Sequence, residues 1–167
     1  MSQRFDVNTK GTDLAQDLAP YITRKTLLIT GVSSGGLGAF FARLWNRARS
    51  YKIRSINSKV EIRSLVLDLQ SFDSVRAAAK EVIAQTEYID VLVNNAGVVA
   101  PPYSKTIDGF ESTFQTNHLS HFLFTNLIME KLLAAPNPRV VIVSSDGYRL
   151  GHVRYNDCDF HVRLSQS

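Results

Sequence analysis

With 167 residues, the chain is long enough for one domain with a real core and short for two. Its 44% hydrophobic content is typical of a globular protein, and its net charge of +4 fits a cofactor phosphate or plain surface charge as well as nucleic acid. The single cysteine, Cys158, excludes an internal disulfide. No run approaches the ~18 apolar residues of a membrane span, and the polar residues 1–20 do not form a signal peptide. We expect a cytoplasmic protein with no nucleic-acid partner.

Predicted elements in the first half of the chain alternate between strand and helix. Residues 1–20 are expected to be a flexible lead-in, and the apolar residues 25–30 predict a buried strand. Helical spacing follows over 39–49, and a β-branched and leucine-rich run predicts a second strand over 60–69. Residues 71–85 predict an amphipathic helix with Ser71 as its N-cap.

The alternation continues in the second half. A third strand is predicted over 89–97, a long helix over 108–135, and a fourth strand over 139–145. Strands that are continuously apolar and alternate with helices indicate a parallel sheet covered on both faces. We therefore expect an α/β fold over 21–157, a Rossmann-like three-layer parallel sheet that is incomplete, with about four strands. Residues 158–167 are expected to be an irregular tail.

A glycine-rich stretch follows the first predicted strand. Glycine permits positive φ and leaves backbone N–H groups open to a phosphate at a helix N-terminus, as Gly31, Gly36 and Gly38 would here. Ser33 and Ser34 could add hydroxyl donors. The Gly-Lys-Ser/Thr of a P-loop is absent. The alternative is a turn that only connects strand to helix.

Five motifs in order accompany that loop: Thr30-Gly31 with Gly36 and Gly38, Asp68 after "LVLDL", "NNAG" at 94–97, "TNHLSHF" around Asn117, and "VVIVSS" at 140–145. The residues at the carboxyl ends of the predicted strands would meet at one edge of a parallel sheet, where such sheets bind ligands: residues 31–38, Asp68, residues 94–97, Ser144 and Ser145. This pattern resembles the short-chain dehydrogenase/reductase family, particularly its retinol-dehydrogenase-like and fungal members. The resemblance covers about residues 25–150, with one extra residue in the glycine loop.

The resemblance implies binding of NADP or NAD. Asp68 would accept a hydrogen bond from the adenine amino group, and Leu69 would lie beside the ring. Asn95, Ala96 and Gly97 would line the central part of the cofactor. Residues expected around the pyrophosphate and adjoining ribose are Gly31, Ser33, Ser34, Gly36, Leu37 and Gly38.

The resemblance also implies hydride transfer between the nicotinamide and a small alcohol or carbonyl compound. Asn117 would anchor the helix that organises a proton-relay water, and Ser145 would hydrogen-bond the substrate oxygen. In the family, a tyrosine transfers the proton and a lysine four residues later lowers its pKa. After Ser145, however, Tyr148 and Tyr155 are not followed by lysine at that spacing. We therefore expect a family member shortened before the Tyr-x-x-x-Lys motif, with its oligomeric state open and a homo-oligomer possible.

Each of these residues also has a plain structural interpretation. Asp68 could cap a strand end, and Asn94 and Asn95 could satisfy a turn. Asn117 could be a polar helix residue, and Ser145 a loop start. His118 and His121 share a helix face but lack the context of a metal site, so packing or surface roles are expected and no metal is predicted.

Residues 46–59 stand where the family pattern has another strand, yet they carry five basic residues and no apolar run. Because an empty position in the sheet would leave backbone groups unpaired, we predict that residues 60–68 pair directly with residues 25–30. The basic residues favour a 2′-phosphate, and hence NADP, about as well as a solvated helix face. A non-catalytic nucleotide-binding or interaction module, or a non-functional truncated product, is the alternative function.

Overall fold

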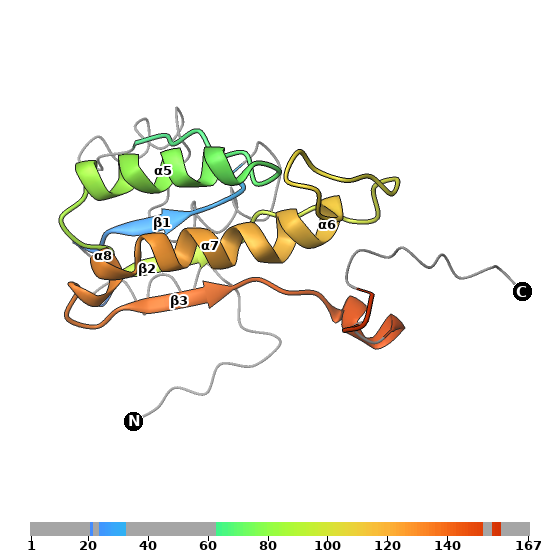
Figure 1. The fold of residues 1–167 in the computed structure, drawn as a ribbon. Coiled ribbons are helices and arrows are strands. Elements are labelled where there is room, and N and C mark those ends of the chain that lie inside the picture. The colour runs from blue at the N-terminus through green and yellow to red at the C-terminus, as the bar shows by residue number, and fades with distance from the viewer. Residues whose placement is uncertain (1–20, 22–23, 33–62, 152–154, 158–167) are drawn as a thin grey trace, which may run out of the picture.

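The computed structural model describes residues 21, 24–32, 63–151 and 155–157. Figure 1 shows the described elements gathered around a small sheet. In chain order they are β1 (Leu27–Ile29), α5 (Phe72–Gln85), β2 (Val91–Asn94), α6 (Ser112–Phe114), the π-helical turn η1 (Gln115–Leu119), α7 (Ser120–Leu127), α8 (Met129–Leu133), β3 (Arg139–Ile142) and the 3₁₀ helix η2 (Asp146–Leu150).

The sheet is parallel and its strand order is β1-β2-β3. Leu28 of β1 is in register with Leu92 of β2, which is in register with Val140 of β3. The connections between these strands contain helices, as parallel strands require. The predicted α/β fold with an incomplete parallel sheet is therefore confirmed, with three strands in the described part of the chain.

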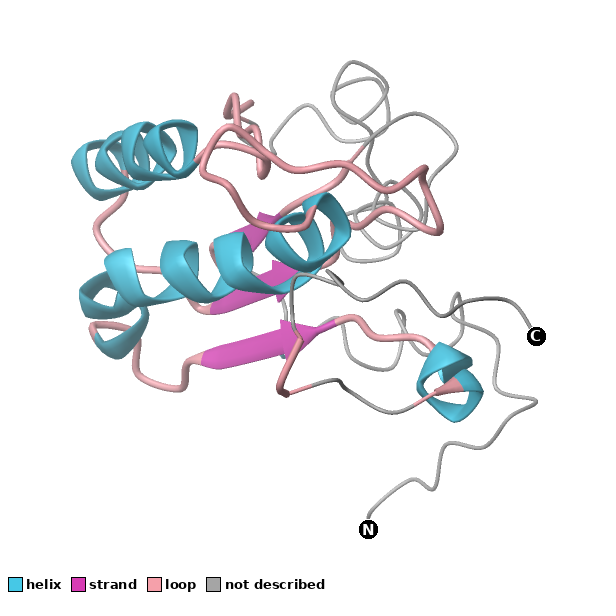
Figure 2. Ribbon diagram, turned by 45° about the vertical axis from the view of Figure 1, so that its right-hand side comes forward, coloured by secondary structure: helices cyan, strands magenta, loops and turns pink. Residues whose placement is uncertain are grey.

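The core lies between the sheet and two helices, α5 and α7. Figures 1 and 2 show both helices on the same face of the sheet. Leu92 of β2 packs there with Phe124 of α7 and Ile128, and all three are fully buried. The helix α5 completes this cluster with Val75, Ala78, Ala79 and Val82. The apolar spacing of residues 71–85 therefore specified the buried face of α5 correctly.

The strands differ in burial, contrary to the expectation of a uniformly covered sheet. Every residue of β2 is buried, as expected for a central parallel strand. In β3, however, Val140 is 43% exposed and Ile142 is 73% exposed. β3 is an edge strand of the described sheet, as is the half-buried β1, so its apolar sequence does not ensure burial.

The prediction of a strand over 60–69 is wrong for residues 63–69, the part of this range that the structure describes. Residues 63–68 form no ladder with another strand, so the predicted pairing with residues 25–30 is also absent there. The side chains still alternate: Leu65 and Leu67 pack against the core, whereas Val66 is 87% exposed. The side chains thus alternate in burial as those of a strand do, but a strand also needs a neighbour for its backbone hydrogen bonds.

The helix predicted over 108–135 is interrupted. It begins at Ser112, because the Glu111 carboxylate accepts hydrogen bonds from Thr113 N at 2.9 Å and Phe114 N at 2.7 Å. One π-helical turn, η1, follows, and the backbone departs from helical geometry again at Ile128 (φ −100°, ψ 9°). π-helical turns within helices often occur at functional sites.

The predicted N-cap of α5 is confirmed. Ser71 Oγ accepts a hydrogen bond from Ser74 N at 3.3 Å. Asp108 supports the same helix end, because its carboxylate accepts a hydrogen bond from Phe72 N at 2.8 Å.

Replacing the cap tests how strongly it holds α5. We expect Ser71→Ala to lower the free energy of unfolding by about 1 kcal/mol, since one helix N–H loses its acceptor. Urea unfolding followed by circular dichroism measures this change. Ser64→Ala, at an exposed serine outside the helices, is the control and should change stability by less than about 0.5 kcal/mol. Equal effects of both substitutions would refute the cap's contribution.

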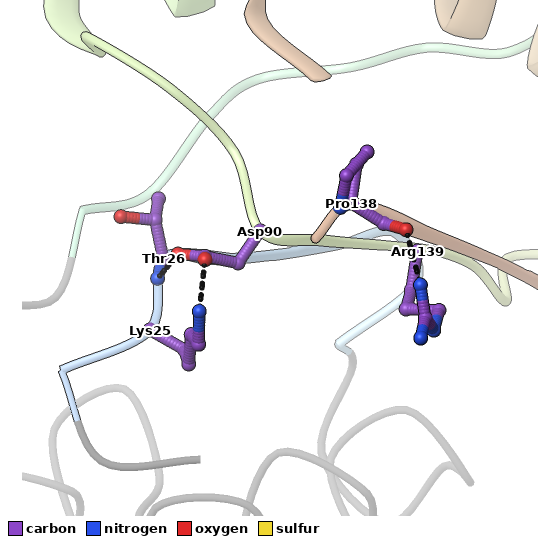
Figure 3. A network of polar contacts seen from close by, with 5 residues as sticks. All are labelled: Lys25, Thr26, Asp90, Pro138 and Arg139. Atoms are coloured by element: carbon purple, nitrogen blue, oxygen red, sulfur yellow. Dashed lines mark hydrogen bonds and ion pairs between the residues drawn. The ribbon is translucent and has the colours of Figure 1, made fainter. Parts of the chain in front are cut away.

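Asp90 joins the amino ends of all three strands (Figure 3). Its side chain, 2% exposed, accepts hydrogen bonds from Lys25 Nζ at 2.6 Å and from Thr26 N at 2.8 Å. Its backbone carbonyl accepts a hydrogen bond from Arg139 N at 2.8 Å. This network holds the end of the sheet opposite the strand ends that the motifs occupy.

Several predictions lie outside the described residues: the lead-in 1–20, the helix 39–49, the basic segment 46–59 and the tail 158–167. Within the described ranges, no helix combines the length and apolar character that crossing a membrane requires.

Candidate functional site

The site is built where β1 and β2 end, around the hydroxyl of Thr30. Thr30 Oγ1 accepts hydrogen bonds from the backbone N–H groups of Asn95 and Ala96, both at 3.0 Å. Thr30 is buried, and its own N–H continues the ladder to Val93 O at 3.1 Å. One side chain at the end of β1 therefore fixes the start of the loop that follows β2.

The Asn95 side chain closes the same junction from the other side. Its Nδ2 donates to Thr30 O at 2.9 Å and to Gly31 O at 3.3 Å. Asn95 is half-buried. Asn95 therefore makes the backbone hydrogen bonds that the structural interpretation expected of it. The same contacts place Asn95 beside Gly31, as the order of the motifs predicted.

Gly31 has no room for a side chain. Its φ is +72°, and a Cβ built there would lie 2.6 Å from Ala96 Cα. No L residue with a side chain fits such a contact, because it meets backbone atoms. The first glycine of the loop is thus required by the close approach of the two strand ends.

Asn117, on the π-helical turn η1, clamps the loop after β2. Its Oδ1 accepts from Val98 N at 2.9 Å, and its Nδ2 donates to Val98 O at 3.0 Å. A Cβ on Gly97 would lie 3.2 Å from Asn117 Oδ1. Asn117 and Gly97 are exposed at this edge. The structure therefore brings together Gly31, Asn95, Ala96, Gly97 and Asn117.

His121 is a member of this site that the sequence interpretation missed. Its Nε2 lies 2.9 Å from Thr30 Oγ1, and its Nδ1 lies 3.3 Å from Asn117 O. Burial lowers the pKa of His121 below its ordinary value of 6.5; the backbone hydrogen bond to Asn117 opposes this shift, and His118 adds to it. The available signal was its position four residues after Asn117, one helical turn away.

Asp68 and Leu69 make local and core contacts in the structure. Asp68 Oδ1 accepts a hydrogen bond from Gln70 N at 2.9 Å, which is a local turn. The Leu69 side chain is buried in the core, and its carbonyl accepts from Ser120 Oγ at 2.6 Å. Asp68 is exposed, so its adenine contact stays a prediction, whereas Leu69 packs inward.

Ser145 follows β3 at the same edge of the sheet. Val143 N donates to Asn94 O at 3.0 Å, which extends the β2–β3 pairing toward this serine. Ser145 Oγ accepts a hydrogen bond from Gly147 N at 3.1 Å and caps η2. Ser145 is exposed, so its hydroxyl can meet solvent or a ligand.

The remaining predicted residues of the glycine loop, Ser33, Ser34, Gly36, Leu37 and Gly38, lie outside the described residues. In the described part of the chain, no three His, Cys, Asp or Glu side chains gather as metal ligands. Buried Asn94 Oδ1 and Thr116 Oγ1 have no hydrogen-bond partner there.

A parallel sheet with a glycine turn after its first strand and polar clamps at its strand ends defines a nucleotide-binding class of fold. A family profile described as short chain dehydrogenase matches residues 25–155. The chain belongs to the short-chain dehydrogenase family.

Individual relatives agree with this assignment. Retinol dehydrogenase 11 of Mus musculus is 40% identical over 147 residues, which are 88% of this chain and 43% of that protein. An uncharacterized protein from Mycobacterium paratuberculosis has 36% identity and a TM-score of 0.63, covering 84% of this chain and 53% of that one. A short-chain dehydrogenase from Escherichia coli CFT073, solved with NADPH, shares the fold at 21% identity and a TM-score of 0.58, covering 77% and 62%. The chain spans less than half the length of the curated relative.

Proposed function

We propose that this chain is the dinucleotide-binding part of an NAD(P)-dependent oxidoreductase that transfers hydride between a nicotinamide and a small alcohol or carbonyl compound. The observation that carries the proposal is the junction of Thr30, Asn95 and Asn117 at the carboxyl ends of β1 and β2. The family membership supports the reaction class.

The residues at this edge fit a dinucleotide. Gly31 and Gly97 are exposed and carry no side chain, so a ligand could approach their backbone closely. Gly31, Asn95, Ala96 and Gly97 would hold its central part, together with the glycine-loop residues predicted from the sequence. When bound, the nicotinamide supplies the hydride acceptor or donor. Ser145, exposed at the same edge, would hydrogen-bond the substrate oxygen, and Asn117 would hold the loop in place.

NADP is our first choice of cofactor, and NAD is the second. The support is the basic composition of residues 46–59, which could meet a 2′-phosphate. Titration of the 167-residue chain with NADPH and with NADH, followed by the fluorescence of the reduced nicotinamide, tests both binding and preference. Saturable binding that is tighter for NADPH is expected. Absence of saturable binding for both nucleotides would refute the proposed function.

Turnover tests the role of Ser145. With retinal or a simple aldehyde, we expect NADPH oxidation above background, and we expect Ser145→Ala to remove it because the substrate oxygen loses its hydrogen bond. NADPH affinity should change by less than about threefold, since the serine acts on the substrate. Ser144→Ala, at an exposed neighbour, is the matched control and should keep the wild-type rate. Full activity of Ser145→Ala would exclude this role.

A non-catalytic nucleotide-binding or interaction module is the second candidate. The observation that favours it concerns residues 1–167 only: within them, neither Tyr148 nor Tyr155 has a lysine four residues later. Removing a general acid–base typically lowers a rate ~10²–10⁴-fold. Saturable NADPH binding without any oxidation of the nucleotide by carbonyl compounds would select this candidate.

The cytoplasmic location stays a proposal. It rests on the single cysteine, Cys158, which fits a reducing compartment. Fractionation of cells that express the tagged chain, compared with membrane and cytosolic markers, tests it. Recovery in the membrane fraction would contradict it.

A further inference from the structure

The hydrogen bonds of Thr30 define the state of a neighbouring side chain. A hydroxyl has one hydrogen to donate and two lone pairs to accept with. The N–H groups of Asn95 and Ala96 occupy both lone pairs of Thr30 Oγ1 at 3.0 Å. The single hydrogen therefore points to His121 Nε2, 2.9 Å away.

This arrangement requires a neutral imidazole with its proton on Nδ1. Nε2 must carry a lone pair to accept from Thr30, and Nδ1–H then donates to Asn117 O at 3.3 Å. An imidazolium would present an N–H to an oxygen whose lone pairs are already used. Because His121 is 6% exposed, water cannot readily take over that bond.

We propose that His121 is a positioning residue: its neutral imidazole orients the Thr30 hydroxyl, which holds the Asn95–Ala96 backbone at the strand ends, and protonation of His121 releases that backbone. The imidazole joins α7 to β1 and, through Thr30, to the loop after β2. The effect of His121 protonation on dinucleotide affinity rests on the proposed function, whereas the coupling between His121 and the loop after β2 does not.

Among the described residues around this junction, His121 is the group whose titration affects the Thr30 hydroxyl. The adjoining residues of β1 and the loop, Thr30, Gly31, Asn95, Ala96 and Gly97, have no ionisable side chain. On its own helical segment, His118 is exposed and disfavours a second positive charge on His121.

The sign of the pH effect follows from that environment. Since burial lowers the pKa of His121 in the folded state, the unfolded chain takes up the proton first as the pH falls through 6.5. The stabilising contribution of neutral His121 is complete above the unfolded value of 6.5 and decreases below it, until the folded-state pKa is reached. The local hydrogen bonds should weaken over the same range, before the sheet unfolds as a whole.

Amide hydrogen exchange in the nucleotide-free protein measures the coupling directly. Protection factors of Asn95 and Ala96, corrected for intrinsic exchange, are compared with that of Leu92 in β2. Between about pH 7.5 and 5.5 we expect protection of the two loop amides to fall more than that of Leu92, by at most about tenfold, since the linked proton uptake by the open state covers only the one pH unit below 6.5. Equal changes at all three amides would overturn the proposal.

Two substitutions separate positioning from packing. His121→Gln keeps an acceptor at the position of Nε2 and does not titrate, so it should retain loop protection at about pH 7.5 and lose the excess pH dependence. His121→Asn is too short to reach Thr30 and should lose about tenfold protection even at neutral pH. The exposed His118, changed to Gln, is the matched control: it should keep loop protection at about pH 7.5 and most of the excess pH dependence, reduced only by the loss of its own effect on the His121 pKa. A wild-type pH profile in His121→Gln, or full protection in His121→Asn, would refute the role.

Nucleotide binding is measured in parallel to keep the two proposals apart. If NADPH binds, its Kd should rise on acidification in the wild type and stay nearly constant in His121→Gln. If NADPH does not bind at any pH, the proposed function fails, while the exchange data still decide the role of His121. Should both His121 variants fail to fold, the comparison of Asn95 and Ala96 with Leu92 in the wild type decides it.

Discussion

Gly31→Ala should lower the free energy of unfolding by about 2–4 kcal/mol and weaken nucleotide binding at least tenfold. Two terms contribute. The backbone at Gly31 has φ +72°, which costs an L residue about 1–2 kcal/mol. A Cβ there would also lie 2.6 Å from Ala96 Cα, so the loop after β2 must move away. That movement would stretch the hydrogen bonds from Asn95 and Ala96 to Thr30.

Gly109 supplies a matched control for the backbone term alone. Its φ is +87°, and a Cβ at this position would meet nothing within 4 Å. Gly109→Ala should therefore cost only about 1–2 kcal/mol and leave NADPH affinity unchanged. Urea unfolding and NADPH titration of both variants separate the terms. If Gly31→Ala were as stable as Gly109→Ala, the close approach of the two strand ends would not be a constraint.

Asp90→Ala should destabilise the fold by about 1–3 kcal/mol, because it removes a buried carboxylate that serves two donors, one of them on the partly exposed Lys25. Thr26 N would lose its acceptor, and Lys25 Nζ would lose the carboxylate 2.6 Å away. Asp90→Asn keeps an oxygen for Thr26 N and loses the charge, so about half of that effect is expected. The network joins strands at the amino ends, and its loss should reduce stability more than it alters the strand-end site directly (Figure 3).

Asp73 provides the comparison for Asp90. Its ion pair with Arg76 spans 3.6 Å, and the aspartate side chain is 95% exposed. Asp73→Asn should change stability by less than about 0.5 kcal/mol, because water and salt screen such a pair. Thermal and urea unfolding measure all three variants. A loss from Asp73→Asn that matched the loss from Asp90→Asn would show that burial does not strengthen the Asp90 network.

Much of the fold was predictable where local pattern and burial agree. The period of residues 71–85 and the Ser71 cap predicted α5, since helix amphipathicity and capping act within a few residues. Apolar runs bounded by glycine and asparagine predicted β1, β2 and β3, whose buried or edge positions depend on neighbours. Residues 63–68 show the limit: the apolar run predicted a strand, yet Leu65 and Leu67 pack against the core without any strand pairing with the segment in the described sheet.

The residues of the candidate site were likewise predictable only in part. Gly31, Asn95, Gly97 and Asn117 carried recognisable motif signals, and they do lie at one edge of the sheet. Leu69 packs in the core, and its expected place beside the adenine ring stays a prediction. His121 was considered only as a metal ligand or packing residue, because its partner Thr30 is 91 residues away in the sequence.

By itself, the sequence determined the family, the alternation of helices and strands, and the residues that mark the strand ends. These properties depend on residue type and short spacing, which sequence displays directly. Only the tertiary structure decided that Thr30 accepts two N–H groups from the loop after β2 and that His121 must accept the remaining hydrogen. The reason is physical: a hydroxyl has few hydrogen-bonding positions, and which groups fill them depends on segments that meet only after folding.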